Sequence, residues 1–212
     1  MVHTLMLTNK EAQKLIEEGE VQIDGIIITK NCELNEISEI RIKGKIERVR
    51  KEFVYLLFNK PAGFESTLNK KIEKNISPFF DNYSGLAIAG RLDKQSKGLL
   101  LLSNDGKWIE NLCNPKFEKE KEYIVSLDKP ISDEFIASFV NGVEIDGFTT
   151  KKCFCEKIDS NTIRIILTEG KNRQIRKMCK VLGFNVISLL RIRISEFHLG
   201  NIKEGNTEIT KI

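Results

Sequence analysis

The chain is poor in the residues that build metal centres. It has only 2 histidines, His3 and His198, and its 5 cysteines form no C-x-x-C pair. Zinc sites draw on His and Cys ligands at short, regular spacings, so the sequence argues against a metal site and against a zinc deaminase. An odd number of cysteines without framework spacing is typical of reduced thiols, which predicts a cytoplasmic protein.

Long hydrophobic runs are also missing. No stretch approaches the roughly 18–20 apolar residues of a membrane span, and the N-terminus lacks the apolar core of a signal peptide. The phosphate-binding patterns G-x-G-x-x-G and G-x-x-x-x-G-K-[ST] are absent as well. We therefore expect no membrane association and no cofactor.

The composition that remains is that of a globular protein with an uneven charge. A length of 212 residues with 41% hydrophobic residues suits one full domain, or one domain and a small module, with a sizeable core. The net charge is only +4, but residues 171–193 hold four of the nine arginines and no acid. Because arginine binds phosphate in a bidentate manner, this segment predicts nucleic acid as the partner.

Residues 1–46 form a predicted module of their own. Thr8 or Asn9 would cap its helix, and Asp24-Gly25 is a strong hairpin signal. The predicted elements are a helix over 10–18, a hairpin over 21–28 and a strand over 39–42. This order resembles the second half of an S4-type RNA-binding module, with Asn9-Lys10 in place of its usual arginine pair. A truncated S4-like module is one interpretation, and a remnant that only packs on the main domain is the other.

The main domain is predicted over residues 53–212, after a linker over 44–52. Residues 65–84 are polar and are expected to form a surface excursion with a short helix. Strands are predicted over 54–58, 99–102, 123–127, 162–168 and 186–194, and helices over 108–113, 130–140 and 172–182. Strands outnumber helices without a regular β-α-β alternation, which predicts an α+β fold with a largely antiparallel mixed sheet.

The most informative stretch reads GRLDKQSKGLLLLSNDG, over residues 90–106. Asp93 follows Gly90 and Arg91 in a tight polar turn, and the leucines of 99–102 predict a strand that is buried on both faces. Such a strand would hold the Asp93 loop rigidly, which suits a catalytic carboxylate. From this loop alone, a solvated turn aspartate is the simpler interpretation.

Four motifs in chain order resemble the RNA pseudouridine synthases that act on small-subunit and large-subunit ribosomal RNA. They are FNKPAG at 58–63, GRLD at 90–93, EKEYIV at 120–125 and EGKNRQIRKM at 169–178. The resemblance implies the pseudouridine synthase fold and the isomerisation of uridine without a cofactor. The chain is most similar to the large-subunit type, which implies a uridine in 23S rRNA and also, as alternatives, a tRNA or a small-subunit target.

The resemblance also implies the residues of the site. Asp93 would be the catalytic carboxylate, Tyr123 would stack on the base, and Arg176 would pair with Asp93 and keep it ionised. Whether Asp93 attacks the sugar, attacks the pyrimidine or removes a sugar proton stays open. For Tyr123 a core aromatic is the alternative, and for Arg176 a phosphate contact. Contacts to RNA are expected from Lys60, Arg91, Lys171, Asn172, Arg173, Gln174, Lys177 and Leu190.

The helix predicted over 172–182 would present several cations together. Residues three and four apart share a helix face, which would group Arg173, Arg176 and Lys177. A non-catalytic RNA-binding or ribosome-binding protein has no need of a carboxylate inside such a basic cleft. An RNA hydrolase usually needs paired carboxylates, histidine or metal. We therefore predict a monomeric isomerase that acts on RNA.

Overall fold

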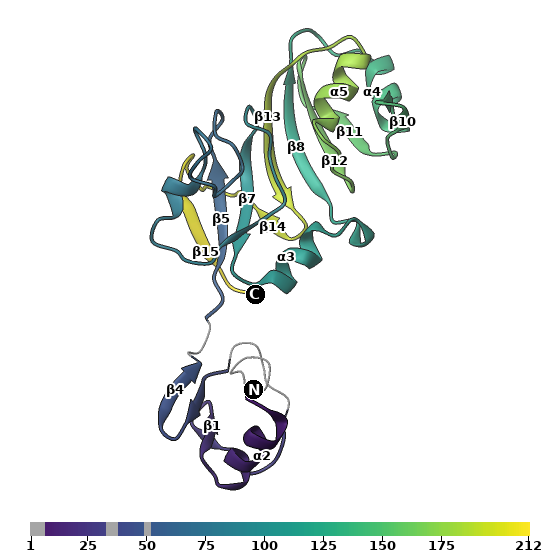
Figure 1. Cartoon of the computed structure of the whole chain (residues 1–212). Coiled ribbons are helices and arrows are strands. Elements are labelled where there is room, and N and C mark those ends of the chain that lie inside the picture. Colours follow the sequence, from purple (N-terminus) through teal and green to yellow (C-terminus); the bar gives the residue numbers. More distant parts are fainter. Residues whose placement is uncertain (1–6, 33–37, 49–51) are drawn as a thin grey trace. The chain divides into compact units, whose positions relative to one another are not determined.

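The structure is a computed structural model that describes residues 7–32, 38–48 and 52–212 (Figure 1). Contacts divide the chain into two units, Met1–Phe53 and Val54–Ile212. His3 and positions 49–51 of the expected linker lie outside the described residues. Within the described ranges, no helix has the length and apolar character needed to cross a membrane.

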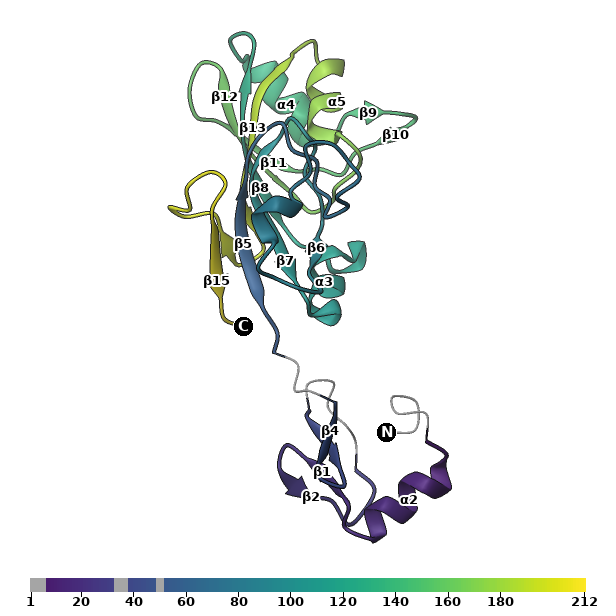
Figure 2. The same ribbon diagram turned by 60° about the vertical axis from the view of Figure 1, so that its left-hand side comes forward.

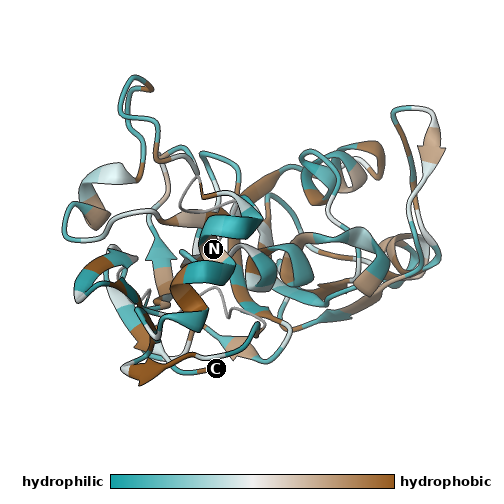
Figure 3. Cartoon of the chain, turned by 60° about the horizontal axis from the view of Figure 1, so that its bottom comes forward, coloured by the Kyte–Doolittle hydropathy of each residue, from teal (hydrophilic) through white to brown (hydrophobic). Residues whose placement is uncertain are grey.

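The first unit combines one helix with a small sheet. Helix α2 (Asn9–Glu17) begins after Thr8, whose hydroxyl accepts a hydrogen bond from the Glu11 N–H, while the Thr8 N–H donates to the Glu11 carboxylate. This reciprocal pair is a capping box. The helix beside the N label in Figure 3 carries both hydrophilic and hydrophobic colours, as an amphipathic helix does.

The small sheet has four strands, one more than the sequence suggested. Its order is β2 (Ile26–Ile27), β1 (Val21–Ile23), β3 (Ile40–Ile42) and β4 (Lys45–Arg48). Strand β4 occupies part of the expected linker, so that expectation was wrong there. Lys43 and Gly44 both have positive φ, 48° and 74°, which is the backbone of a tight hairpin turn. Lys43 has no turn preference strong enough to reveal this hairpin in the sequence.

The second unit is built on one large mixed sheet of nine strands (Figures 1 and 2). Its main path runs β11-β12-β8-β13-β7-β5-β15, with β14 beside β13 and β6 beside β7. Only β13 and β7 are parallel among these described pairs. The strands are β5 (Tyr55–Lys60), β6 (Ala87–Ala89), β7 (Lys97–Ser103), β8 (Lys121–Leu127), β11 (Phe154–Lys157), β12 (Thr162–Leu167), β13 (Val186–Ile194), β14 (Phe197–His198) and β15 (Thr207–Thr210). The predicted α+β, largely antiparallel fold is confirmed.

Strand β7 is covered on both faces, as its four leucines predicted. Leu99 and Leu101 pack on one side, where helix α3 (Gly106–Cys113) lies. Leu100 and Leu102 pack on the other side, against Ile76 and Phe80. The segment 65–84, expected as a surface excursion, therefore supplies core residues, and its short 3-10 helix (Ser77–Phe80) covers the sheet. All four leucines are fully buried, so the strand forms a rigid base for the loop before it.

A second core lies under helices α4 (Asp133–Asn141) and α5 (Gln174–Val181), which pack against β8, β11 and β12 (Figure 1). Ser132 caps α4: its hydroxyl accepts a hydrogen bond from the Phe135 N–H. The start of α5 differs from the predicted 172–182. Arg173 adopts a left-handed backbone, φ 51° and ψ 30°, so the helix begins at Gln174, two residues later than predicted. A short ribbon of β9 (Glu144–Ile145) and β10 (Phe148–Thr149) lies between the two helices in sequence.

The parallel contact between β7 and β13 requires a residue without a side chain. Gly98 has φ +105°, and a Cβ there would lie 2.3 Å from the Arg191 carbonyl oxygen and 2.8 Å from its backbone nitrogen. Both obstacles are backbone atoms of the neighbouring strand. The two halves of the large sheet therefore join at a point where only glycine fits.

We expect Gly98→Ala to lower the free energy of unfolding by roughly 2–5 kcal/mol, because it adds backbone strain and a steric clash. Urea denaturation measures the loss. Gly106→Ala is the matched control, since a Cβ at Gly106 meets nothing within 4 Å, and its effect should stay within about 0.5 kcal/mol. Equal stability of the two variants would contradict the proposed constraint at the β7–β13 joint.

Candidate active site

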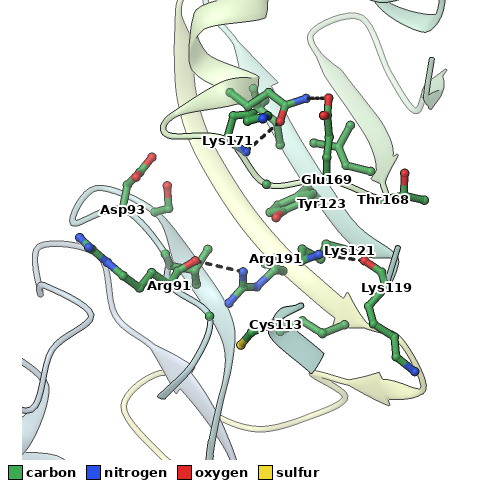
Figure 4. A pocket seen from close by; sticks show the side chains of 18 of the residues that line it. Arg91, Asp93, Cys113, Lys119, Lys121, Tyr123, Thr168, Glu169, Lys171 and Arg191 are labelled. Atoms are coloured by element: carbon green, nitrogen blue, oxygen red, sulfur yellow. Dashed lines mark hydrogen bonds between the residues drawn. The ribbon is translucent and has the colours of Figure 1, made fainter. Parts of the chain in front are cut away.

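A cavity of about 380 Å³ opens beside the joint of β7 and β13 (Figure 4). The loop before β7 lines one side with Arg91 and Asp93, and β8 contributes Tyr123. The turn before α5 and the helix itself add Arg173 and Arg176. Motifs that are far apart in the sequence thus converge on one hollow, as the resemblance implied.

The Asp93 loop is fastened to the body of the protein by its backbone. Gly90 has φ +80°, which turns the chain, and the Ser96 N–H donates to the Asp93 carbonyl at 2.9 Å. Ser66 is buried, and its hydroxyl donates to the Leu92 carbonyl and accepts from the Leu92 N–H. The Asp93 side chain is 29% exposed, so the carboxylate is reachable from the cavity while its backbone is fixed.

Lys60 is not an RNA contact, contrary to the prediction. Its side chain is fully buried, and its ammonium donates to the carbonyls of Pro61 and Phe64 at 2.8 Å and to that of Lys94 at 3.4 Å. Burial lowers the pKa of Lys60 to about 8, and the charges of Glu65 and Asp93 oppose this shift. Lys60 therefore ties the segment after β5 to the Asp93 loop from inside.

The ion pair of Asp93 involves a different arginine from the one expected. Arg173 Nη1 lies 3.9 Å from Asp93 Oδ2. Arg176 instead donates to the carbonyls of Val186 and Gln95 and to the Ser96 hydroxyl, at 3.2–3.3 Å. The predicted Arg176–Asp93 contact was wrong, because Arg176 is drawn to the backbone beside the loop while Arg173 turns toward its carboxylate.

The charge of Asp93 still affects the pKa of Arg176. Burial, assisted by the charge of Arg173, lowers the pKa of Arg176, and the charge of Asp93 opposes that shift. Its Nε is buried and has no hydrogen-bond partner among the residues that the structure describes. The two arginines thus place positive charge near Asp93 in different ways, one by an ion pair and one by its bonds to the loop backbone.

Tyr123 and Leu189 form the apolar wall of the cavity. Both are buried, with 7% and 5% of their surfaces exposed, and both line the hollow. Leu190, the predicted residue, packs instead on the opposite side of the sheet, toward α3. Successive side chains of a strand point to opposite faces, so the choice between Leu189 and Leu190 depended on a register that the sequence did not reveal.

The remaining predicted RNA contacts divide into exposed and internal residues. Lys171, Asn172 and Arg173 are exposed, and Lys171 and Arg173 line the cavity. Gln174 is buried, and its amide bonds Glu169 and the Lys171 N–H, so its expected RNA contact is not supported.

Lys177 pairs with Asp146 at 2.5 Å. Because Arg173 precedes α5, the expected single helix face with Arg173, Arg176 and Lys177 does not exist.

Sequence reasoning missed that two arginines of the basic segment bond within the protein, Arg191 in the interior and Arg193 on the far face of the sheet. Arg191 is only 2% exposed; it donates from Nε to the Leu99 carbonyl at 2.8 Å and from Nη1 to the Arg91 carbonyl at 3.2 Å. Arg193 pairs with Glu120 and Glu122. The alternation of arginine and isoleucine over 191–194 predicts one solvated arginine face. The register shift between Arg191 and Arg193, which pairs Arg191 with Tyr123 and Arg193 with Glu122, gave no signal in the sequence.

Comparisons with known proteins agree with this geometry. A family model described as RNA pseudouridylate synthase matches residues 54–180. The dual-specificity RNA pseudouridine synthase RluF of Salmonella typhi is 36% identical over 200 residues, which cover 93% of this chain and 69% of that protein. The chain belongs to the RNA pseudouridine synthase family. Its members are isomerases, and the predicted enzyme class is confirmed.

Further members of this family show similar coverage. The ribosomal small subunit pseudouridine synthase A of Haemophilus influenzae is 30% identical, over 94% of this chain and 88% of that protein. A crystal structure of a pseudouridylate synthase superposes with a TM-score of 0.72 at 29% identity, over 99% of this chain and 93% of that one. The pseudouridine synthase fold assigned from the sequence is therefore confirmed.

Lys60 gives this family member a pH-dependent stability that can be measured. Its pKa is about 8 in the fold and 10.5 in its ordinary state. Between these values the unfolded chain binds more protons, so the free energy of unfolding rises with pH. Relative to Lys60→Met, the unchanged protein should gain about 1 kcal/mol per pH unit between about pH 8 and pH 10.

Urea unfolding of both proteins across this pH range measures the gain. The exposed Lys211→Met variant is the control and should follow the unchanged protein at every pH. A constant difference between Lys60→Met and the unchanged protein would show that the Lys60 ammonium keeps its ordinary pKa.

Proposed function

We propose that this chain isomerises a specific uridine of structured RNA to pseudouridine, with Asp93 as the catalytic carboxylate. One observation carries the proposal: Asp93, Tyr123 and the cations Arg173 and Arg176 line one cavity of about 380 Å³. A partly exposed carboxylate on a fixed loop, beside an aromatic ring and two guanidinium groups, suits chemistry on a nucleoside better than simple RNA binding. A binding surface alone would be weakened by a negative charge among its phosphate contacts.

The reaction needs no electron donor or acceptor. The N1–C1′ bond of the uridine breaks, a C5–C1′ bond forms, C5 loses its proton and N1 gains one. The base must leave its stack to enter the cavity. There Tyr123 offers an apolar face, while Asp93 acts on the ribose–base unit as nucleophile or base. Arg173 lies 3.9 Å from this carboxylate, and Arg176 bonds the backbone beside it.

The proposed substrate is 23S rRNA. The support is the resemblance of its motifs to the large-subunit type and the 30% identity, over 97% of this chain, to the ribosomal large subunit pseudouridine synthase B of Bacillus subtilis. The Salmonella relative is described as dual-specificity, which favours a second RNA target, and a tRNA uridine is the candidate that the resemblance implies. We further propose that residues 1–46 are a truncated S4-like RNA-binding module and that residues 53–212 form the catalytic domain of a cytoplasmic monomer. Mapping pseudouridine in RNA from cells with and without the gene tests the choice of RNA.

Asp93→Asn should lower the single-turnover rate of pseudouridine formation by at least about 100-fold, because an amide is neither a nucleophile nor a base. RNA affinity should stay within a few-fold, since the amide keeps the shape of the carboxyl group. Asp81→Asn is the control: Asp81 is exposed and pairs with Lys70 away from the cavity. Normal turnover by Asp93→Asn would remove Asp93 from the catalytic role.

RNA affinity should fall steeply with salt, because bound cations release counterions from phosphate. Replacing Lys171, Arg173 and Lys177 together by Gln should reduce the slope of log affinity against log salt by about 2. A control triple variant at Lys70, Lys203 and Lys211 should leave the slope unchanged. If both triple variants have the slope of the unchanged protein, the turn before α5 is not part of the RNA surface.

A further inference from the structure

The cations on the two faces of strand β8 differ in whether a carboxylate accompanies them. On the face away from the cavity, Glu122 accepts from Arg193 at 2.6 Å and from Arg164 at 3.2 Å, so these guanidinium groups are neutralised by a carboxylate. On the cavity face, Lys121 and Tyr123 stand two residues apart on the same side of the strand. Arg191, the cross-strand partner of Tyr123, lies beside them.

The cavity-facing cations have no such carboxylate. Arg191 is 2% exposed, and its Nη2 is buried without a hydrogen-bond acceptor among the residues described in the structure. Arg191 lines the cavity, and Figure 4 shows its guanidinium between Arg91 and Cys113. Leaving a buried guanidinium nitrogen unbonded is costly, and a bound anion at this nitrogen would remove that cost.

Lys121 adds a second positive charge to this end of the cavity. Its ammonium donates to the Lys119 carbonyl at 2.8 Å, the only acceptor recorded for it within the described residues. Burial lowers the pKa of Lys121, and the charge of Arg191 lowers it further. The two like charges therefore act on each other at close range, and neither forms an ion pair with a carboxylate in the described part of the chain.

We propose that Arg191 and Lys121 form an anion subsite that binds a phosphodiester of the RNA strand carrying the target uridine. Two partly desolvated cations without a counter-charge select a group that is anionic at every working pH, and phosphate meets this condition while neutral uracil does not. Lys119, whose side chain also lines the hollow, extends the positive charge to its rim. The assignment of this anion to RNA rests on the proposed function, whereas the anion site itself does not.

Cys113 provides a built-in reporter for this subsite. It is exposed and lines the same end of the cavity. Burial raises the pKa of its thiol, while the Gly90 N–H and the charges of Lys121 and Arg191 lower it. An anion bound between the cations would both cover the thiol and cancel their effect, so alkylation of Cys113 should slow. Cys32 is exposed in the other unit and serves as an internal control on the same molecule.

The first experiment measures iodoacetamide labelling of Cys113 and Cys32 by peptide mass spectrometry, with inorganic phosphate titrated at constant ionic strength. Phosphate should slow Cys113 labelling saturably, by at least about threefold, and leave Cys32 unchanged. Lys121→Met should abolish this protection, and the exposed Lys211→Met control should keep it. No protection in the unchanged protein, or equal protection in Lys121→Met, would overturn the subsite.

The second experiment decides whether the anion is RNA phosphate. Lys121→Met should weaken RNA binding roughly tenfold, and the exposed Lys211→Met control should bind RNA as the unchanged protein does. Arg191→Lys should bind RNA more tightly than Arg191→Met. Both variants lack the guanidinium, and only the lysine variant keeps the positive charge. If phosphate protects Cys113 but Lys121→Met binds RNA normally, the site holds a free anion and the RNA assignment is wrong. The labelling experiment does not depend on catalysis. Its result therefore tests the anion subsite even if Asp93→Asn remains active and the proposed catalytic role fails.

Discussion

The parallel contact between β7 and β13 is the constraint on which the rest of the structure depends. It joins two antiparallel halves of the sheet at Gly98, where the neighbouring backbone leaves no space for a side chain. One half carries the Asp93 loop, and the other carries Tyr123 and packs against α5. The cavity therefore exists only because the halves meet in this register. Arg191 strengthens the joint, since its guanidinium bonds two carbonyls from the half that carries Asp93.

The distribution of charge follows from that joint. The basic segment 171–193 looks uniform in sequence, but its cations do three different things. Lys171 and Arg173 are exposed at the mouth of the cavity, and Arg193 is neutralised by two glutamates on the far face of the sheet. Arg191 is interior and only partly bonded. The net charge of +4 thus says little about affinity, because position decides which cations can meet phosphate.

The features that could be predicted were those set by local pattern. The apolar run of β7 and the Ser132 cap of α4 follow from spacing and turn chemistry, whereas the convergence of the Asp93 and Tyr123 motifs was implied by the family resemblance. What could not be predicted depends on register and on single backbone angles. Leu189 rather than Leu190 faces the cavity because of strand register, and the left-handed backbone of Arg173 brings it, rather than Arg176, to Asp93. The burial of Lys60 is hidden in sequence, since lysine is normally a surface residue.

The internal fastening of the Asp93 loop has a consequence for how the enzyme uses its affinity for RNA. Buried Ser66 bonds Leu92, and buried Lys60 bonds the Lys94 carbonyl of the loop and two carbonyls of the segment after β5, so the loop backbone is fixed by the protein itself. The entropy cost of ordering the loop is met when the chain folds. Contacts with RNA then need not immobilise it, and their free energy is left for unstacking the uridine and turning it inward.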